Sequence, residues 1–492
     1  MYRVLDEVGN SLQQMKVARI MAHTMARVSG LAALSAAVLM TGCGNQYRPV
    51  ISSISPVGPA GQPAKYAAVV SSPSPTSPGL LTTVDFSGDT ILSTPQILSN
   101  PSYYAINQSG TEGYVINTVG NFDDFPLSSP STLLTANVVQ TSLPANSSPV
   151  SISVVNLISA GLTVFVPSTG YSGVAALSGS GPSLEQEIAV GPNPVYVVGA
   201  DGALRVYAIS QGSTTACPAT GEVSAIEGAS PLSVSATLCV GTTPVYGVMT
   251  TDGRRAFILN SGSGTVSVIN VVNNALDAAV PTIALPSITY KNSGGTTVTA
   301  APKPVWADLT NITNEMVVLN QGDGTGPGSL SIVSIPLCIS STQPSNPNCS
   351  STNPADATGF GSIVATVPVG VNPTMVAMLH DGTQAYVINQ KDSTGQCNAG
   401  EGSVTVVNLI TTEVQTTICG ISTPAVIASP NGPALVYGHP NSVSVTTGNP
   451  TGKVYITSPD AEFLTVIYTD TDSVVTHIPL QGFGLRVLMT SP

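Results

Sequence analysis

Short runs of alternating apolar and polar residues, separated by turn residues, dominate the chain after residue 64. The runs are rich in Val, Ile, Thr and Tyr, and clusters of Gly, Pro, Asn and Asp separate them. Alternate apolar residues, such as Val266 with Val268 and Val404 with Val406, give the period of two that turns one face of a strand toward a core. The 3.6-residue period of amphipathic helices is absent from this part. The pattern therefore predicts an all-β body of many short strands joined by tight turns.

One sequence unit recurs along this body. In its clearest copies, which open at Pro244 and Pro373, a Val-Gly-x-x-Pro start leads to an Asp-Gly turn, a strand ending in Asn, and the run Gly-x-Val-x-Val-x-Asn. The opening position falls at residues 101, 149, 194, 244, 304, 373 and 424, and Leu485 takes it in an eighth copy. Repeats of this size with four strands each are typical of β-propeller blades.

The two ends of the body complement each other. Residues 482–490 read as the opening strand of one more repeat, and the residues from Lys65 onward read as a repeat that lacks this strand. We expect the C-terminal strand to join the N-terminal blade, which would close the ring and leave no sheet edge unpaired. The count favours eight four-stranded antiparallel blades, with seven as the alternative; a β-sandwich array or a solenoid is the rival fold.

The repeat resembles the YVTN family of β-propellers, which is also seen in proteins described as lactonase-like or surface-layer-like. The resemblance rests on Ala256-Phe-Ile-Leu-Asn260, on Ala385-Tyr-Val-Ile-Asn389 and on Tyr114-Val-Ile-Asn117, and it covers roughly residues 64–490. It implies a propeller and, as one possible activity, lactone hydrolysis in the axial channel.

An export signal precedes the repeats. Residues 29–42 are apolar but too short to span a bilayer, and Lys16, Arg19 and Arg27 come before them. The run Leu39-Met40-Thr41-Gly42-Cys43 resembles the lipobox of bacterial lipoproteins, in which the cysteine is acylated; an ordinary signal peptide with an incidental cysteine is the alternative. The sequence thus predicts a lipoprotein signal peptide at 1–42, lipidated Cys43 with a Pro/Gly-rich tether at 43–63, and a propeller at 64–492.

Six further cysteines remain in the exported part. Cys217 and Cys239 are 22 residues apart, as are Cys397 and Cys419, and both spacings fall at the same place in a repeat. An even number of cysteines in an exported chain favours disulfides, so we expect these two pairs within blades. The remaining pair, Cys338 with Cys349, would then tie an insertion. A zinc site is the rival interpretation, but it would need a close Cys pair or nearby His ligands.

Composition and charge narrow the function. Only 8% of the residues are charged, and the part after residue 42 holds 10 basic and 24 acidic residues without a basic stripe. Nucleic acids and anionic membrane surfaces are bound mainly through clustered Lys and Arg, so neither is an expected partner.

Candidate chemistry is sparse along the chain. The histidines of the body share no spacing, and Arg254 and Arg255 sit at a turn where we expect them to face solvent. Acidic groups are interpreted as turn residues rather than as a calcium site. The candidate polar residues are His380, His439, His477, Arg205, Arg254, Arg255, Arg486, Asp123, Asp124, Asp323, Asp470 and Asp472. We assign no catalytic, cofactor-binding or metal-binding residue.

These observations favour a monomeric lipoprotein of the bacterial cell envelope, anchored in the outer membrane, whose propeller binds a protein or glycan partner without catalysis. A lactonase-like hydrolase that uses the axial channel is the alternative. The two differ in what lines the axis: convergent His, Arg and Glu side chains would favour the hydrolase.

Overall fold

The computed structural model describes residues 66–310, 314–336, 359–421, 438–446 and 452–490, and the backbone of two short strands at 425–427 and 434–436. The chain divides into two units, Met1–Gln62 and Pro63–Pro492, and the described residues belong to the second. The predicted signal peptide, Cys43, the tether, Cys338 and Cys349 lie outside the described residues. Within the described part, no helix is long and apolar enough to cross a bilayer.

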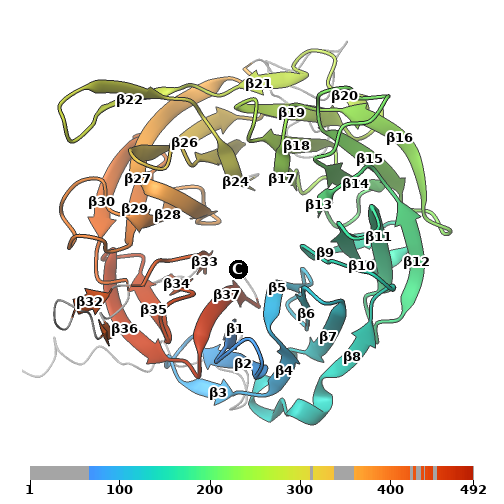
Figure 1. The fold of residues 1–492 in the computed structure, drawn as a ribbon, viewed down its shortest axis with the longest axis horizontal. Helices are drawn as coiled ribbons and strands as arrows, with labels where there is room; N and C mark the ends of the chain where they lie inside the picture. Colours follow the sequence, from blue (N-terminus) through green and yellow to red (C-terminus); the bar gives the residue numbers. More distant parts are fainter. Residues whose placement is uncertain are drawn as a thin grey trace, which may run out of the picture. The chain divides into compact units, whose positions relative to one another are not determined.

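The fold is all-β, and most of its strands form four-stranded antiparallel meanders arranged around a common centre (Figure 1). The first meanders along the chain are β5 (Pro101–Ile106), β6 (Glu112–Asn117), β7 (Asn121–Pro126) and β8 (Val139–Ser142); β9 (Ser153–Leu157), β10 (Gly161–Ser168), β11 (Gly173–Ser178) and β12 (Leu184–Ala189); β13 (Pro194–Val198), β14 (Arg205–Ser210), β15 (Glu222–Glu227) and β16 (Ser233–Cys239); and β17 (Pro244–Met249), β18 (Arg255–Asn260), β19 (Thr265–Asn270), β20 (Ala275–Leu276) and β21 (Thr282–Ala284). In each, the first strand lies nearest the centre in Figure 1.

The later meanders continue this order. They are β24 (Pro304–Thr310), β25 (Glu315–Asn320), β26 (Pro327–Ser334), β27 (Ile363–Met378), β28 (Gln384–Lys391), β29 (Ser403–Asn408) and β30 (Glu413–Ile418); and β33 (Ser442–Val445), β34 (Lys453–Thr457), β35 (Phe463–Tyr468) and β36 (Ser473–Pro479). Two hairpins lie outside them, β22 (Ile288–Lys291) with β23 (Thr297–Ala300), and β31 (Ala425–Ile427) with β32 (Ala434–Val436). Two short 3-10 helices, η2 (Pro130–Thr132) and η3 (Thr135–Asn137), connect β7 to β8.

Strand β27 is long because it serves two meanders. Its first part pairs with β26, from Val333 opposite Ile363 to Pro327 opposite Val371, and its second part pairs with β28 as far as Met378. The outer strand of one meander therefore continues without a break as the central strand of the next, which is why seven strands share one sheet.

The last strand pairs with the first strand of the described chain, as the sequence predicts. Strand β37 (Phe483–Met489) lies antiparallel to β1 (Tyr66–Ser72), which leads on to β2 (Pro78–Asp85), β3 (Ile91–Ser93) and β4 (Gln96–Ser99). Val487 faces Val69 in this pairing, and both side chains are fully buried. The C-terminal strand thus supplies the central strand of the sheet that begins the body.

Two of the opening positions predicted for the repeat, at residues 424 and 485, are wrong. The repeat expected to open at 424 has its central strand at β33 instead, because the hairpin β31–β32 is inserted between β30 and β33. In the C-terminal copy, Gly484 rather than Leu485 takes the opening position. Gly484 pairs with Ser71 and Arg486 with Val70, so Leu485 is the bulged residue that the ladder skips.

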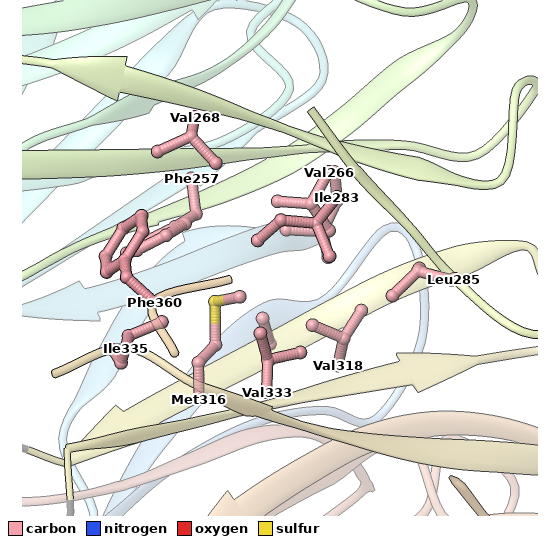
Figure 2. Packing of buried hydrophobic residues seen from close by; sticks show 12 residues of the cluster. Phe257, Val266, Val268, Ile283, Leu285, Met316, Val318, Val333, Ile335 and Phe360 are labelled. Carbon is pink, nitrogen blue, oxygen red and sulfur yellow. The ribbon is translucent and has the colours of Figure 1, made fainter. Parts of the chain in front are cut away.

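Apolar side chains fill the space between neighbouring meanders. Figure 2 shows one such layer, in which Phe257 and Val268 of the β17–β21 sheet pack toward Met316 and Val333 of the next. Two faces of each sheet need such cover, so one meander cannot bury its apolar residues alone. Stability therefore depends on each sheet having a neighbour on both sides.

Both described disulfides lie within single meanders, as predicted. Cys217, in the loop between β14 and β15, bonds to Cys239 at the end of β16, and Cys397 bonds to Cys419 in the matching place beside β28–β30. The Cα atoms are 5.3 Å apart in each pair. Each bond ties the loop between the second and third strands to the end of the fourth.

A buried ion pair joins the last meander to the first sheet. Lys453 Nζ of β34 lies 2.8 Å from Asp89 Oδ2 and donates to the Phe86 carbonyl at 2.6 Å. The ammonium group also lies 5.0 Å from the centre of the Phe86 ring. Residues far apart in sequence are thereby held together beside the β37–β1 contact.

We expect Asp89→Asn to lower the free energy of unfolding by about 3–5 kcal/mol, because it leaves the buried ammonium group without its counter-charge. Urea denaturation followed by circular dichroism measures the change. Arg254→Gln is the control: its pair with Asp252 is 3.9 Å long and exposed, so the loss should stay below about 1 kcal/mol. Equal losses in the two variants would contradict the role given to Lys453.

Candidate functional site

Six of the central strands share a register shift that places the side chain two residues after the opening position. Proline has no N–H for the ladder, and the pairing register shifts directly after it, so one residue is skipped. The residues placed in this way are Tyr103, Tyr196, Tyr246, Trp306, Met375 and, after Gly484, Arg486. A single position in the repeat thus supplies a layer of large side chains at the axis.

Five members of this layer contact one another; we call Tyr103, Tyr196, Tyr246, Trp306 and Arg486 the axial cluster. The ring centres of Tyr196 and Tyr246 are 4.6 Å apart, and those of Tyr246 and Trp306 are 4.1 Å apart and stacked. The Arg486 Cζ atom lies 4.2 Å from the centre of the Tyr103 ring and 5.5 Å from that of Trp306. The cluster therefore bridges strands β5, β13, β17, β24 and β37 across the centre.

Two adjoining cavities border the axial cluster. Their volumes are about 440 Å³ and 360 Å³, and both are lined by Tyr246, Val248, Asp308, Leu309, Arg486 and Leu488. The first extends over β5, β9 and β13, the second over β27 and β33. Cavities of this size, whose walls combine apolar side chains with hydroxyl and charged groups, suit small molecules.

Asp308 is the acidic group of these walls, and main-chain hydrogen bonds occupy both of its oxygens. Oδ1 accepts from the Leu309 N–H and Oδ2 from the Met378 N–H, each at 2.9 Å. Burial raises the pKa of the carboxyl group, against the opposing effect of these two hydrogen bonds. The Asp308 carboxyl group therefore links β24 to β27 through the Met378 N–H, and it stabilises the contact between the two strands.

Two tyrosines of the axial cluster, Tyr196 and Tyr246, stay protonated at neutral pH. Burial raises the pKa of Tyr196 to about 12 and holds that of Tyr246 well above its usual value. Their hydroxyl groups therefore remain hydrogen-bond donors beside the permanently charged Arg486 guanidinium.

The other polar candidates are dispersed. Arg486 belongs to the axial cluster. Arg205 does not; its Nε atom pairs with Glu227 Oε1 at a distance of 3.0 Å. The expectation that Arg255 faces solvent is wrong: its side chain is 1% exposed and pairs with Asp277 at 3.2 Å. The strand β18 begins at Arg255, so its side chain turns inward where that of Arg254 does not.

The histidines take three separate positions. His380 is exposed and borders the second cavity, while His439 Nδ1 lies 2.6 Å from Asp460 Oδ2. His477 lies in β36 with its Nδ1 3.1 Å from Thr465 Oγ1, and burial lowers its pKa. Of the three, His380 alone is near the axis.

Two acidic candidates, Asp323 and Asp472, hold neighbouring groups through hydrogen bonds. Asp323 accepts hydrogen bonds from the Gly326 N–H and the Tyr290 hydroxyl, which hold its pKa below the usual range. Asp472 accepts from Tyr386 and Gln415. Among the described residues, no three His, Cys, Asp or Glu side chains are grouped to hold a metal ion.

The aromatic members of the axial cluster are not among the residues singled out from the sequence. They stand two residues after the opening prolines at 101, 194, 244 and 304, as in Pro244-Val-Tyr246 and Pro304-Val-Trp306. Aligning the repeats on the opening position would have identified this column, because bulky aromatic residues recur there.

No family model matches the chain, and no curated protein matches it. Among solved structures, the dihydro-heme d1 dehydrogenase NirN in complex with DHE is similar at a TM-score of 0.54 and 12% identity, over 87% of this chain and 75% of that one. Apo AztD from Citrobacter koseri gives a TM-score of 0.53 at 10% identity, over 86% and 97%. A putative 6-phosphogluconolactonase from Bacteroides fragilis reaches 0.47 at 11% identity, over 88% and 99%, and a value below 0.5 does not establish a shared fold.

Four-stranded antiparallel sheets around one centre and the likeness to NirN and AztD identify the architecture. The fold is a β-propeller. At these identities the likeness concerns the fold alone, so the chemistry of the propeller axis has to be argued from its own residues.

Burial also perturbs a carboxyl group away from the axis. Asp124 is 4% exposed, its Oδ1 has no hydrogen-bond partner, and burial together with the Glu112 charge raises its pKa to about 6. Since the pKa is raised on folding, this group stabilises the fold below its unfolded pKa. That stability is lost as the pH rises through about 6.

We expect Asp124→Asn to be more stable than the wild type at pH 8, by about 3 kcal/mol, and to lose this advantage at pH 4. Urea unfolding at the two pH values measures the difference. Glu185→Gln, at an exposed carboxylate, is the control and should leave the pH profile unchanged. If the free energy of unfolding of the wild type instead rises relative to that of Asp124→Asn between pH 4 and pH 8, the raised pKa of Asp124 is contradicted.

Proposed function

We propose that this chain is a non-catalytic binding module of the bacterial cell envelope. In this proposal the body is a closed propeller of eight blades, and the axial cavities hold the ligand. The pairing of β37 with β1 supports closure, and the sets of four strands, with β27 shared by two of them, support the count of eight.

The observation that carries the binding role is the composition of the axis. Four aromatic side chains and one guanidinium border the two cavities, and Asp308 is held by main-chain N–H groups. Aromatic rings with a few fixed polar groups give affinity and orientation, whereas general acid–base catalysis needs a free base beside the reacting group.

The hydrolase remains the second candidate because Arg486, Asp308 and His380 border the same cavity. For hydrolysis, His380 would have to reach the bound lactone and activate water. Release of acid from glucono-δ-lactone, lost in His380→Ala, would favour the hydrolase over the binding module.

Loops outside the blades offer a surface for a protein or glycan partner. The hairpin β22–β23 projects from the ring in Figure 1, and the Tyr290 hydroxyl fixes it to Asp323 at 2.6 Å. Replacing residues 288–300 with a short Gly-Ser linker should abolish capture of an envelope partner by the full-length protein from detergent-solubilised membranes, and leave ligand binding at the axis intact.

We expect Val248→Phe to block the axial cavities, because Val248 lines both of them. Compounds from a small-molecule panel that raise the melting temperature of the wild type should lose at least half of that shift in the variant. The matched control is Val119→Phe, at a β6–β7 turn residue that is 75% exposed, and its shifts should equal those of the wild type. Hits unaffected by Val248→Phe would place binding elsewhere.

The envelope location rests on Cys43. Replacing it in Cys43→Ser removes the thiol that would be acylated, so the protein should move from the membrane fraction to the soluble fraction after ultracentrifugation. Cys217→Ser with Cys239→Ser, which removes a disulfide of the body, is the control and should stay with the membranes. Membrane retention of Cys43→Ser would contradict the lipid anchor.

A further inference from the structure

We infer that the axial cavity binds a small carboxylic acid with an apolar or aromatic body, and that its carboxylate pairs with Arg486. This inference rests on the proposed binding role of the same cavity and specifies the chemistry of the ligand.

The first argument is the missing counter-charge of Arg486. Three other cations that face inward each have a carboxylate partner: Arg205 with Glu227 at 3.0 Å, Arg255 with Asp277 at 3.2 Å and Lys453 with Asp89 at 2.8 Å. Among the described residues, no Asp or Glu oxygen lies within ion-pair distance of Arg486. A cation removed from bulk water without a counter-charge is costly, so an anion that enters the cavity gains the pairing energy.

Aromatic rings cover the planar face of the Arg486 guanidinium, so N–H groups at its edge can donate hydrogen bonds to a ligand. Aromatic rings of Tyr103 and Trp306 lie over the group, and its side-chain hydrogen bond within the described residues goes to Tyr103. The buried Nε–H has no partner there. A guanidinium has five N–H donors in a planar fork, which matches the two oxygens of a carboxylate.

Asp308 does not supply the missing charge. Its two oxygens accept the N–H groups of Leu309 and Met378, and burial raises its pKa, which disfavours the charged form. The neutral phenols of Tyr196 and Tyr246 add donors rather than negative charge. A cationic ligand would meet repulsion, and a neutral one would leave Arg486 unpaired.

The cavity walls indicate the rest of the ligand. Val248, Leu309 and Leu488 line both cavities, and the larger has a volume of about 440 Å³. An alkyl body can pack against these three side chains, and a phenyl body can also stack on Tyr246 or Trp306.

Trp306 makes the experiment direct because the chain contains a single tryptophan. Its ring belongs to the axial cluster, so its fluorescence reports on the cavity. The full chain is titrated with 4-phenylbutyrate, with the neutral 4-phenylbutyramide and with the cation 4-phenylbutylamine, and calorimetry gives the dissociation constants. We expect the carboxylate to bind at least tenfold more tightly than the amide, and the amine not to bind.

Variants assign the preference to Arg486. In Arg486→Gln the affinity for 4-phenylbutyrate should fall at least tenfold while the affinity for the amide stays within twofold. Arg486→Lys keeps the positive charge but lacks the planar fork of N–H donors. Its affinity for 4-phenylbutyrate should lie between those of the wild type and of Arg486→Gln. Arg254→Gln, at an exposed arginine of the β17–β18 turn, is the control and should bind like the wild type. Circular dichroism melting of each variant verifies folding, and Arg486→Lys serves if Arg486→Gln unfolds.

The outcomes separate this inference from the proposed function. If the acid and the amide bind equally well, and Val248→Phe abolishes the binding of both, the carboxylate pairing is overturned and the binding module still stands. Unchanged binding of the acid in Arg486→Gln would overturn it equally. Absence of binding by all three probes would overturn the inference, while the small-molecule panel and the hairpin replacement would still test the binding module.

Discussion

Burial on both faces of every sheet is the constraint on which this fold depends. A layer such as that of Phe257, Val268, Met316 and Val333 belongs to two neighbouring sheets, so neither sheet has a complete core by itself. The first and the last sheets would therefore each leave one apolar face exposed unless they met. Strand β37 pairs with β1, and Val69 and Val487 of this sheet pack with Tyr455 and Val466 of the β33–β36 sheet, which covers these faces. The buried Lys453–Asp89 pair joins the same two sheets.

The strand at this junction also carries the charge of the candidate site. Gly484 takes the opening position of the repeat, and the bulge at Leu485 turns Arg486 toward the centre as it turns Tyr246 and Trp306 in other copies. The aromatic rings come from β5, β13, β17 and β24, so the axial cluster forms only when strands from both halves of the chain are assembled. The axial cluster therefore depends on the pairing of β37 with β1 as well as on the strands that carry the rings.

The sequence predicted the elements whose cause is local or repeated. Alternation of apolar residues predicted the strands, and the half-repeats at the two ends predicted the pairing of β37 with β1. The recurring 22-residue spacing predicted Cys217 with Cys239 and Cys397 with Cys419.

The failures concern features without a local signature. The hairpin β31–β32 displaced the repeat expected at 424, because an insertion has no repeat pattern of its own. Arg255 was expected in solvent because its partner Asp277 lies beyond β19 in sequence. The axial cluster was missed because its members meet only across the centre of the ring, although their common position in the repeat is visible in the sequence.

A crystal structure of the protein grown with 4-phenylbutyrate would test whether β37, the strand that pairs with β1, also supplies the charge of the proposed binding site. We expect β37 paired with β1 and the carboxylate of the acid within hydrogen-bond distance of the Arg486 guanidinium, with the phenyl ring against the cavity walls. A protein carboxylate paired with Arg486, or a β37 strand detached from β1, would contradict it.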